Sequence, residues 1–172
     1  LGLKFPTAIP SFLLRPYIGL YLSQDRKIIQ MTTCAQYDPE LFYTLKPGSC
    51  VFENREFSVA TMVNHKGLRD DEQSLEAPEI IALGDSYTMG WGVNQQETFP
   101  QVLEKLTNKK VLNTGISSYG TAREMTMLNR LDLSNLRYLV IQYHANDYEE
   151  NLTYHRNGFN LPIQSEEKYD SL

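Results

Sequence analysis

The pattern of hydrophobic and polar residues changes near residue 78. Before that position the chain has short apolar runs separated by prolines and shows no sustained helical period. Residues 49–53 and 56–64 are predicted to form two strands of a hairpin, with the turn at Asn54 and Arg55. The pattern therefore predicts a small β-rich appendage over residues 1–78.

From residue 79 onward, apolar runs alternate with amphipathic stretches. Strands are predicted at 80–83, 111–113 and 138–143, and helices at 98–106 and 121–131. Their apolar stripes would be formed by Phe99, Val102, Leu103 and Leu106, and by Ala122, Met125, Leu128 and Leu131. This alternation is typical of parallel strands joined by right-handed crossovers. We therefore expect residues 79–172 to form an α/β fold, a three-layer α/β/α sandwich around a parallel sheet.

Composition and charge exclude some classes of function. The chain has 172 residues and a net charge of −5, which argues against a general nucleic-acid binder. No stretch is long and apolar enough to span a bilayer. The acidic stretch 69–79, with Asp70, Asp71 and Glu72, is interpreted as a solvated linker between the two parts. We expect no metal site there.

The sequence contains two cysteines, Cys34 and Cys50, without the spacing of a metal site or a CxxC pair. Two buried free thiols are the interpretation that the sequence favours. A disulfide between them is the alternative, and it would indicate an oxidising compartment.

Polar and small residues follow each predicted strand of the second part. These segments are Gly84-Asp85-Ser86, Asn113-Thr114-Gly115 and Asn146-Asp147. Because parallel strands end at one edge of a sheet, we expect the three segments to lie close together. A serine at the end of a buried strand can expose both its hydroxyl and its backbone N–H, which acyl transfer requires of a nucleophile and an oxyanion donor.

In order and spacing, these segments resemble the first three conserved blocks of the SGNH hydrolases, also called the GDSL esterase/lipase family. The resemblance covers about residues 79–151 and implies a flavodoxin-like sandwich that needs no metal or organic cofactor. It implies that Ser86 is the nucleophile and that the oxyanion hole consists of the Ser86 and Gly115 N–H groups and the Asn146 amide. The third block of the family begins with glycine two residues before the asparagine, and here that residue is His144.

The family's last block, an Asp-x-x-His pair near the end of the domain, has no match in this chain. His144 and His155 remain as candidates for a substitute base. The expectation from the resemblance is therefore the N-terminal portion of a longer SGNH protein, with a sheet incomplete at its C-terminal side. A naturally shortened relative is the second interpretation. In either case, we expect this polypeptide to be weak or inactive.

The resemblance implies an ester hydrolase or acyl transferase that forms an acyl-Ser86 intermediate. Its substrate would be a small ester, an acyl lipid or an acylated glycan, and Tyr87, Trp91 and Tyr119 could line the pocket. The alternative is a non-catalytic binding or assembly module. The open sheet edge could also pair two copies into a homodimer. Residues 37–76 are similar to a lead-in segment of some bacterial SGNH proteins, which predicts an extracytoplasmic location.

Overall fold

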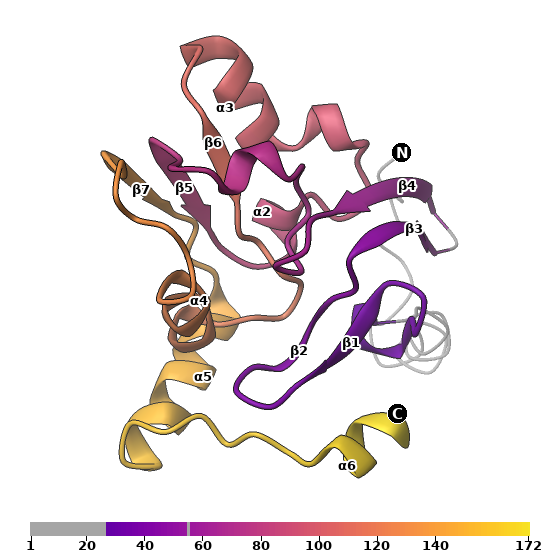
Figure 1. Ribbon diagram of the computed structural model, residues 1–172. Helices are drawn as coiled ribbons and strands as arrows, with labels where there is room; N and C mark the ends of the chain where they lie inside the picture. Colours follow the sequence, from indigo (N-terminus) through magenta and orange to yellow (C-terminus); the bar gives the residue numbers. More distant parts are fainter. Residues whose placement is uncertain (1–26, 55) are drawn as a thin grey trace, which may run out of the picture.

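The computed structural model describes residues 27–54 and 56–172 (Figure 1). The first 26 residues of the predicted appendage therefore lie outside the described part. So does Arg55, one of the two residues at the predicted hairpin turn.

The second part of the chain contains a parallel three-stranded sheet of order β6-β5-β7. Its strands are β5 (Ile80–Leu83), β6 (Val111–Asn113) and β7 (Tyr138–Ile141). The middle strand β5 is apolar and buried along its whole length, as a strand covered on both faces should be. The predicted α/β fold class is confirmed.

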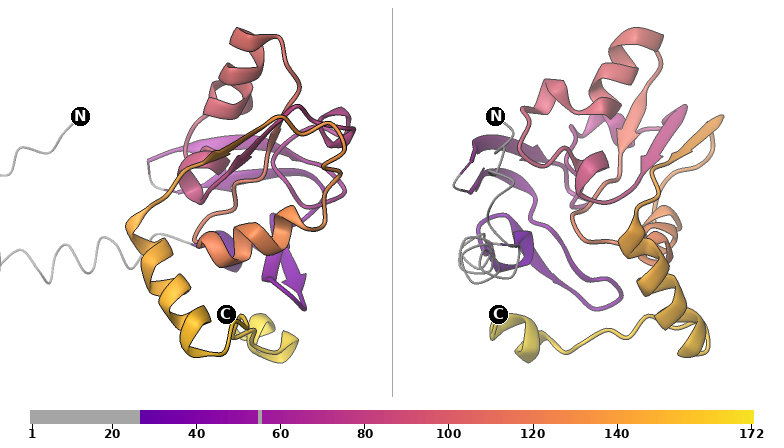
Figure 2. Two further views of the ribbon diagram at one scale, coloured as in Figure 1. Left: turned by 90° about the vertical axis from the view of Figure 1, so that its left-hand side faces the viewer. Right: turned by 180° about the vertical axis from the view of Figure 1, so that it is seen from behind.

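Helices cover both faces of this sheet. They are α2 (Ser86–Met89), α3 (Phe99–Thr107), α4 (Thr121–Leu128) and α5 (Ala145–Arg156), whereas the last helix, α6 (Glu166–Asp170), lies against β1 of the N-terminal part. The first crossover runs from β5 to β6, and the second runs back past β5 to β7. Right-handed crossovers in opposite directions place α3 and α4 on opposite sides of the sheet, as Figure 2 shows.

The N-terminal part consists of two antiparallel hairpins. They pair β1 (Ala35–Asp38) with β2 (Phe42–Leu45), and β3 (Gly48–Glu53) with β4 (Ser58–Val63). The predicted hairpin of 49–53 with 56–64 is confirmed as β3–β4. Short 3-10 turns occupy Ile28–Gln30, Gln73–Leu75 and Gln95–Glu97. One hydrophobic core includes Leu41, Leu45 and Phe52 from the hairpins together with Ile81 and Leu83 from β5.

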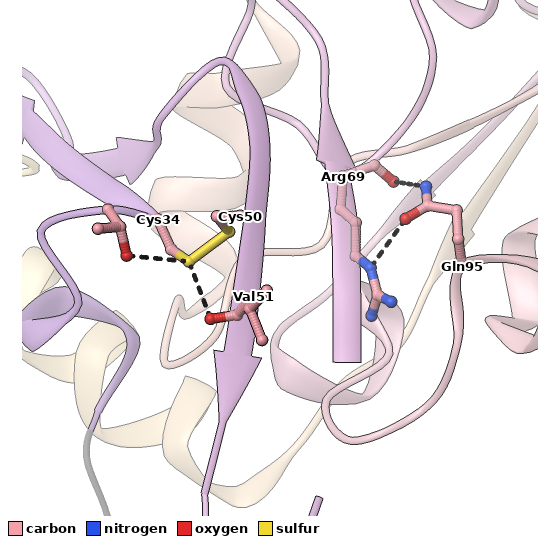
Figure 3. The surroundings of a disulfide bond; sticks show 6 residues. Cys34, Cys50, Val51, Arg69 and Gln95 are labelled. Carbon is pink, nitrogen blue, oxygen red and sulfur yellow. Dashed lines mark hydrogen bonds between the residues drawn. A yellow bond between two sulfur atoms is a disulfide. The ribbon is translucent and has the colours of Figure 1, made fainter. Parts of the chain in front are cut away.

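Cys34 and Cys50 form a disulfide, so the expectation of two free thiols is wrong (Figure 3). Cys34 precedes β1 and Cys50 lies in β3, and their Cα atoms are 5.3 Å apart. The sequence could not reveal this proximity, because it depends on how the two hairpins pack against each other. The bridge ties these hairpins together at the side of the core.

Removing the bridge is expected to lower the free energy of unfolding by about 3 kcal/mol, because it closes a loop with a sequence separation of 16 residues. The measurement is urea unfolding of the Cys34→Ala/Cys50→Ala double variant against the oxidised wild type. Wild-type protein treated with a reductant in the same series serves as the control and should lose a similar amount. Equal stability of the oxidised and reduced proteins would contradict the bridge.

The predicted apolar stripes are only partly buried. On α3, Leu106 is 79% exposed, and Phe99 and Val102 also reach the surface. On α4 the buried residues are Glu124, Met127 and Leu128, whereas Met125 is exposed. Of the stripe predicted for α4, Leu128 is buried and Leu131 packs against the core, whereas Met125 is exposed, so the buried side includes Glu124 and Met127 instead.

Strand β7 is an edge strand of the described sheet and is exposed in spite of its apolar sequence. Tyr138, Leu139 and Ile141 are between 39% and 56% exposed. Leu139 and Ile141 belong to one face of the strand and Tyr138 to the other, so both faces are in part uncovered. Pairing of two copies through a sheet edge stays a prediction, and β7 is the strand that it would use. No helix within residues 27–54 and 56–172 is long and apolar enough to cross a membrane.

Candidate active site

Ser86 lies at the first position of α2, directly after the turn that follows β5. The carboxylate of Asp85 caps this short helix by accepting a hydrogen bond from the Tyr87 N–H at 3.0 Å. The N–H of Ser86 precedes the first helical hydrogen bond, so it has no partner within α2. The Ser86 hydroxyl is half-buried and has no hydrogen-bond partner among the described residues. Both groups are therefore available to a ligand.

A cavity of ≈ 410 Å³ adjoins Ser86. Its other lining residues come from α2, the loop after it and the start of α3, and they are Tyr87, Gly90, Trp91, Val93, Glu97, Thr98 and Phe99. The predicted pocket residues Tyr87 and Trp91 are among them. Tyr119 is not, because it is fully buried and donates its hydroxyl hydrogen to the carbonyl of Tyr43. The aromatic rings and the single carboxylate of Glu97 give this cavity a mixed apolar and polar wall.

Gly115 lies against the backbone of α2. A Cβ at this position would come within 2.2 Å of the Met89 nitrogen, so only glycine allows the segment after β6 to approach this closely. The Gly115 N–H donates to Oδ1 of Asn113 at 3.0 Å. The segment therefore reaches the Ser86 turn, but the N–H that the family resemblance assigns to the oxyanion hole is engaged within its own segment.

His144 and Asn146 follow β7 and begin α5. The Asn146 amide donates from Nδ2 to the Tyr119 carbonyl at 3.0 Å, and its Oδ1 lies 2.6 Å from His144 Nδ1. An amide oxygen can only accept, so this hydrogen bond requires the proton on Nδ1, and in the neutral ring with that tautomer Nε2 is a hydrogen-bond acceptor. That tautomer is the one a general base requires.

The His144 ring contacts both sequence neighbours of Ser86. Its centroid is 5.5 Å from that of the Tyr87 ring, and Nδ1 is 3.9 Å from Oδ2 of Asp85. The other candidate base, His155, lies near the far end of α5, where it packs against Phe159. A helix rises about 1.5 Å per residue, which puts His155 about 14 Å along the axis from Asn146. The fold thus brings His144, but not His155, to the Ser86 turn.

Sequence reasoning missed a buried group beside this site, the carboxyl of Glu124 on α4. It is fully buried, and neither oxygen has a hydrogen-bond partner in the described part of the chain. Burial, reinforced by the negative charges of Asp147, Asp85 and Glu150, raises the pKa of Glu124 to about 8. A charged residue in an amphipathic helix is normally read as exposed, so no sequence signal pointed to it.

Residues 69–79 match their prediction as a solvated linker only in part, since Asp71 and Glu72 are exposed but other residues of the segment are buried. Arg69 and Asp70 are fully buried, and Ser74 is buried as well. Asp70 accepts hydrogen bonds from the Asn113 N–H at 2.9 Å and from the Gln101 side chain at 3.0 Å. Acidic composition suggested exposure, but these carboxylate bonds connect the segment to the strand ends. Within the described ranges, no group of His, Cys, Asp or Glu is arranged to hold a metal ion.

A scan against protein-family models finds no match for the sequence, and a search of the curated proteins also finds none. Among solved structures, the chain is similar to the crystal structure of AlinE4, an SGNH-hydrolase family esterase, at 21% sequence identity with a TM-score of 0.38. The match covers 51% of this chain and 57% of that one. The likeness is weak and spans only about half of either protein.

Proposed function

We propose that the chain carries a serine acyl-transfer site, in which Ser86 forms an acyl-enzyme with an ester substrate. The observation that carries the proposal is the unpartnered Ser86 hydroxyl beside a cavity, with the His144 ring against Tyr87 and 3.9 Å from Asp85. A serine hydroxyl becomes a useful nucleophile only when a nearby base takes its proton. His144 is the base that we assign.

In this mechanism, Ser86 Oγ attacks the ester carbonyl carbon and its proton passes to His144 Nε2. The oxyanion that forms accepts hydrogen bonds from the Ser86 N–H and from the second Nδ2 hydrogen of Asn146. The alcohol leaves with the proton from His144. Water or an acceptor hydroxyl then removes the acyl group from Ser86, which gives hydrolysis or transfer respectively.

The third oxyanion donor of the proposal is the Gly115 N–H. It can donate to the oxyanion only if its present hydrogen bond to Asn113 Oδ1, at 3.0 Å, is broken. Loss of one donor typically reduces turnover by about 10²–10³-fold. This supports the expectation that the chain is a slow catalyst. A non-catalytic binding or assembly module is the second candidate, and the engaged Gly115 N–H favours it.

We include in the proposal the substrate class and the location that the sequence suggested. A small ester, an acyl lipid or an acylated glycan would place its acyl group in the aromatic cavity beside Ser86. The Cys34–Cys50 bridge supports an extracytoplasmic location, since disulfides persist in oxidising compartments.

A fluorophosphonate probe tests this function. Ser86 Oγ would form a bond to phosphorus, fluoride would leave, and the serine proton would pass to His144. We expect a single adduct by intact mass, mapped to the peptide that contains Ser86 and absent from Ser86→Ala. Ser134→Ala, which removes an exposed serine hydroxyl elsewhere, is the matched control and should label like the wild type. A folded wild-type chain without an adduct would favour the binding module.

A further inference from the structure

Arg69 places its guanidinium inside the protein, against the end of α2. The residue is fully buried, and it belongs to the segment between β4 and β5, far from Ser86 in sequence. Its Nη1 donates to the carbonyls of Met89 at 3.1 Å and Gly90 at 2.5 Å, and its Nη2 donates to the carbonyl of Val93 at 2.7 Å. These carbonyls lie at the end of α2 and in the loop after it, and that of Gly90 also accepts from the Val93 N–H at 3.3 Å.

Gln95 holds Arg69 in place. Nε of Arg69 donates to Oε1 of Gln95 at 3.1 Å, and Nε2 of Gln95 donates back to the Arg69 carbonyl at 3.3 Å (Figure 3). The guanidinium carbon also lies 5.8 Å from the centroid of the Phe52 ring. Burial lowers the pKa of Arg69 to about 10, so the side chain is still charged at neutral pH. The cation is thus compensated by backbone carbonyls and one amide oxygen.

Two of the three residues whose carbonyls Arg69 binds line the Ser86 cavity. Gly90 and Val93 line that cavity, and Trp91 lies between them. The indole of Trp91 stacks on Phe52 and meets Phe57 edge-on, with centroid distances of 5.9 and 5.5 Å. The carboxylate of the neighbouring residue Asp70 accepts a hydrogen bond from the Asn113 N–H at 2.9 Å. One dipeptide therefore contacts both the loop after α2 and the last residue of β6.

We propose that Arg69 is a positioning residue for the Ser86 site, which fixes α2 and the Gly90–Val93 loop so that the serine and the cavity wall keep one geometry. The proposal rests on the proposed function for its effect on reactivity, but the fixing of the loop is independent of it. Lysine cannot replace arginine here, because one ammonium group cannot reproduce the planar fork that spans three carbonyls.

The test compares Arg69→Lys with wild type at a temperature where circular dichroism shows both folded. Trp91 is the only tryptophan of the sequence, so its fluorescence reports on the loop alone. We expect acrylamide to quench Trp91 more strongly in the variant. The rate at which the fluorophosphonate modifies Ser86 should fall about 10²-fold, as a misplacement of roughly 1 Å typically causes.

Arg130→Lys is the matched control. Arg130 binds the carboxylates of Asp38 and Glu40 on the β1–β2 hairpin. Its loss should therefore lower the stability of the protein without changing the quenching of Trp91 or the rate at which Ser86 is modified. If Arg69→Lys does not fold, Gln95→Ala replaces it, since this change loosens the guanidinium without burying an unpaired charge. Gln95→Ala should also increase the quenching of Trp91 and reduce the rate of Ser86 modification, by smaller amounts than Arg69→Lys.

The outcomes separate the two proposals. A wild-type chain that resists the probe overturns the proposed function, and Trp91 quenching then decides the role of Arg69. The second outcome is a wild-type chain that reacts with the probe. If a folded Arg69→Lys or Gln95→Ala variant then has the same labelling rate and the same Trp91 quenching as the wild type, the positioning role alone is overturned. Equal effects of Arg69→Lys and Arg130→Lys on Trp91 would also overturn it, because they would reflect general loss of stability.

Discussion

Replacing His144 with alanine is expected to slow modification of Ser86 by the fluorophosphonate about 10²–10⁴-fold, the usual contribution of a general base. The reason is the position of the ring, which packs on Tyr87 and is oriented by Asn146. The start of α5 should survive the change, because the capping bond from the His144 N–H to Asp147 Oδ2 at 2.5 Å uses only the backbone of residue 144.

His155→Ala is the control for this measurement. It also removes an imidazole from α5, but at the end remote from Ser86, and it should leave the labelling rate unchanged. Pseudo-first-order rates from intact mass, taken across a range of probe concentrations, give the comparison. Equal rates for wild type and His144→Ala would remove His144 from the mechanism while leaving Ser86 as the reactive group.

The second large effect concerns the stability of the protein as a function of pH. The Glu124 carboxyl has a pKa of about 8 in the folded protein, against 4.5 when unperturbed. The folded state therefore holds this proton more tightly than the unfolded state, so the stabilisation that this group contributes is fully present below pH 4.5 and is lost as the pH rises to about 8. Integrated over that window, the loss is about 5 kcal/mol.

Glu124→Gln should remove this loss, because glutamine has a similar shape and does not ionise. In urea unfolding across the window from pH 4.5 to about 8, the free energy of unfolding of the variant should rise relative to that of the wild type as the pH rises. A shallower decline should remain in the variant, since burial also raises the pKa of Asp70, to about 7. Glu149→Gln, an exposed carboxylate on α5, is the control. Parallel pH curves for wild type and Glu124→Gln would show that the Glu124 carboxyl does not carry the effect.

The sequence predicted best where local pattern and burial agree. Strands β5 and β6 begin and end as predicted, and both are buried along their whole length. Parallel topology also led to the expectation that the segments at Ser86, Gly115 and Asn146 would lie at one edge. In the structure, Gly115 touches α2, and His144, two residues before Asn146, touches Asp85 and Tyr87.

What the sequence did not predict depends on contacts between distant segments. The bond from Arg69 to Gly90 joins residues that are 21 positions apart, and nothing in the acidic composition around Arg69 indicates it. The same holds for the Cys34–Cys50 bridge and for the burial of Glu124. The hydrogen bond between Gly115 and Asn113 is local, but it depends on a side-chain rotamer that sequence motifs do not encode.

The exposed edge strand β7 gives the candidate site two halves of unequal rigidity. Ser86 follows β5, which is paired on both sides, whereas His144 and Asn146 follow β7, which is paired only with β5 among the described strands. Amide hydrogens along β7 should therefore exchange with deuterium sooner than those of β5, through local opening events that leave the rest of the sheet closed. Each such opening would carry the imidazole away from a serine that stays in place, so the fraction of time that β7 is closed sets an upper limit on how often the two can react together.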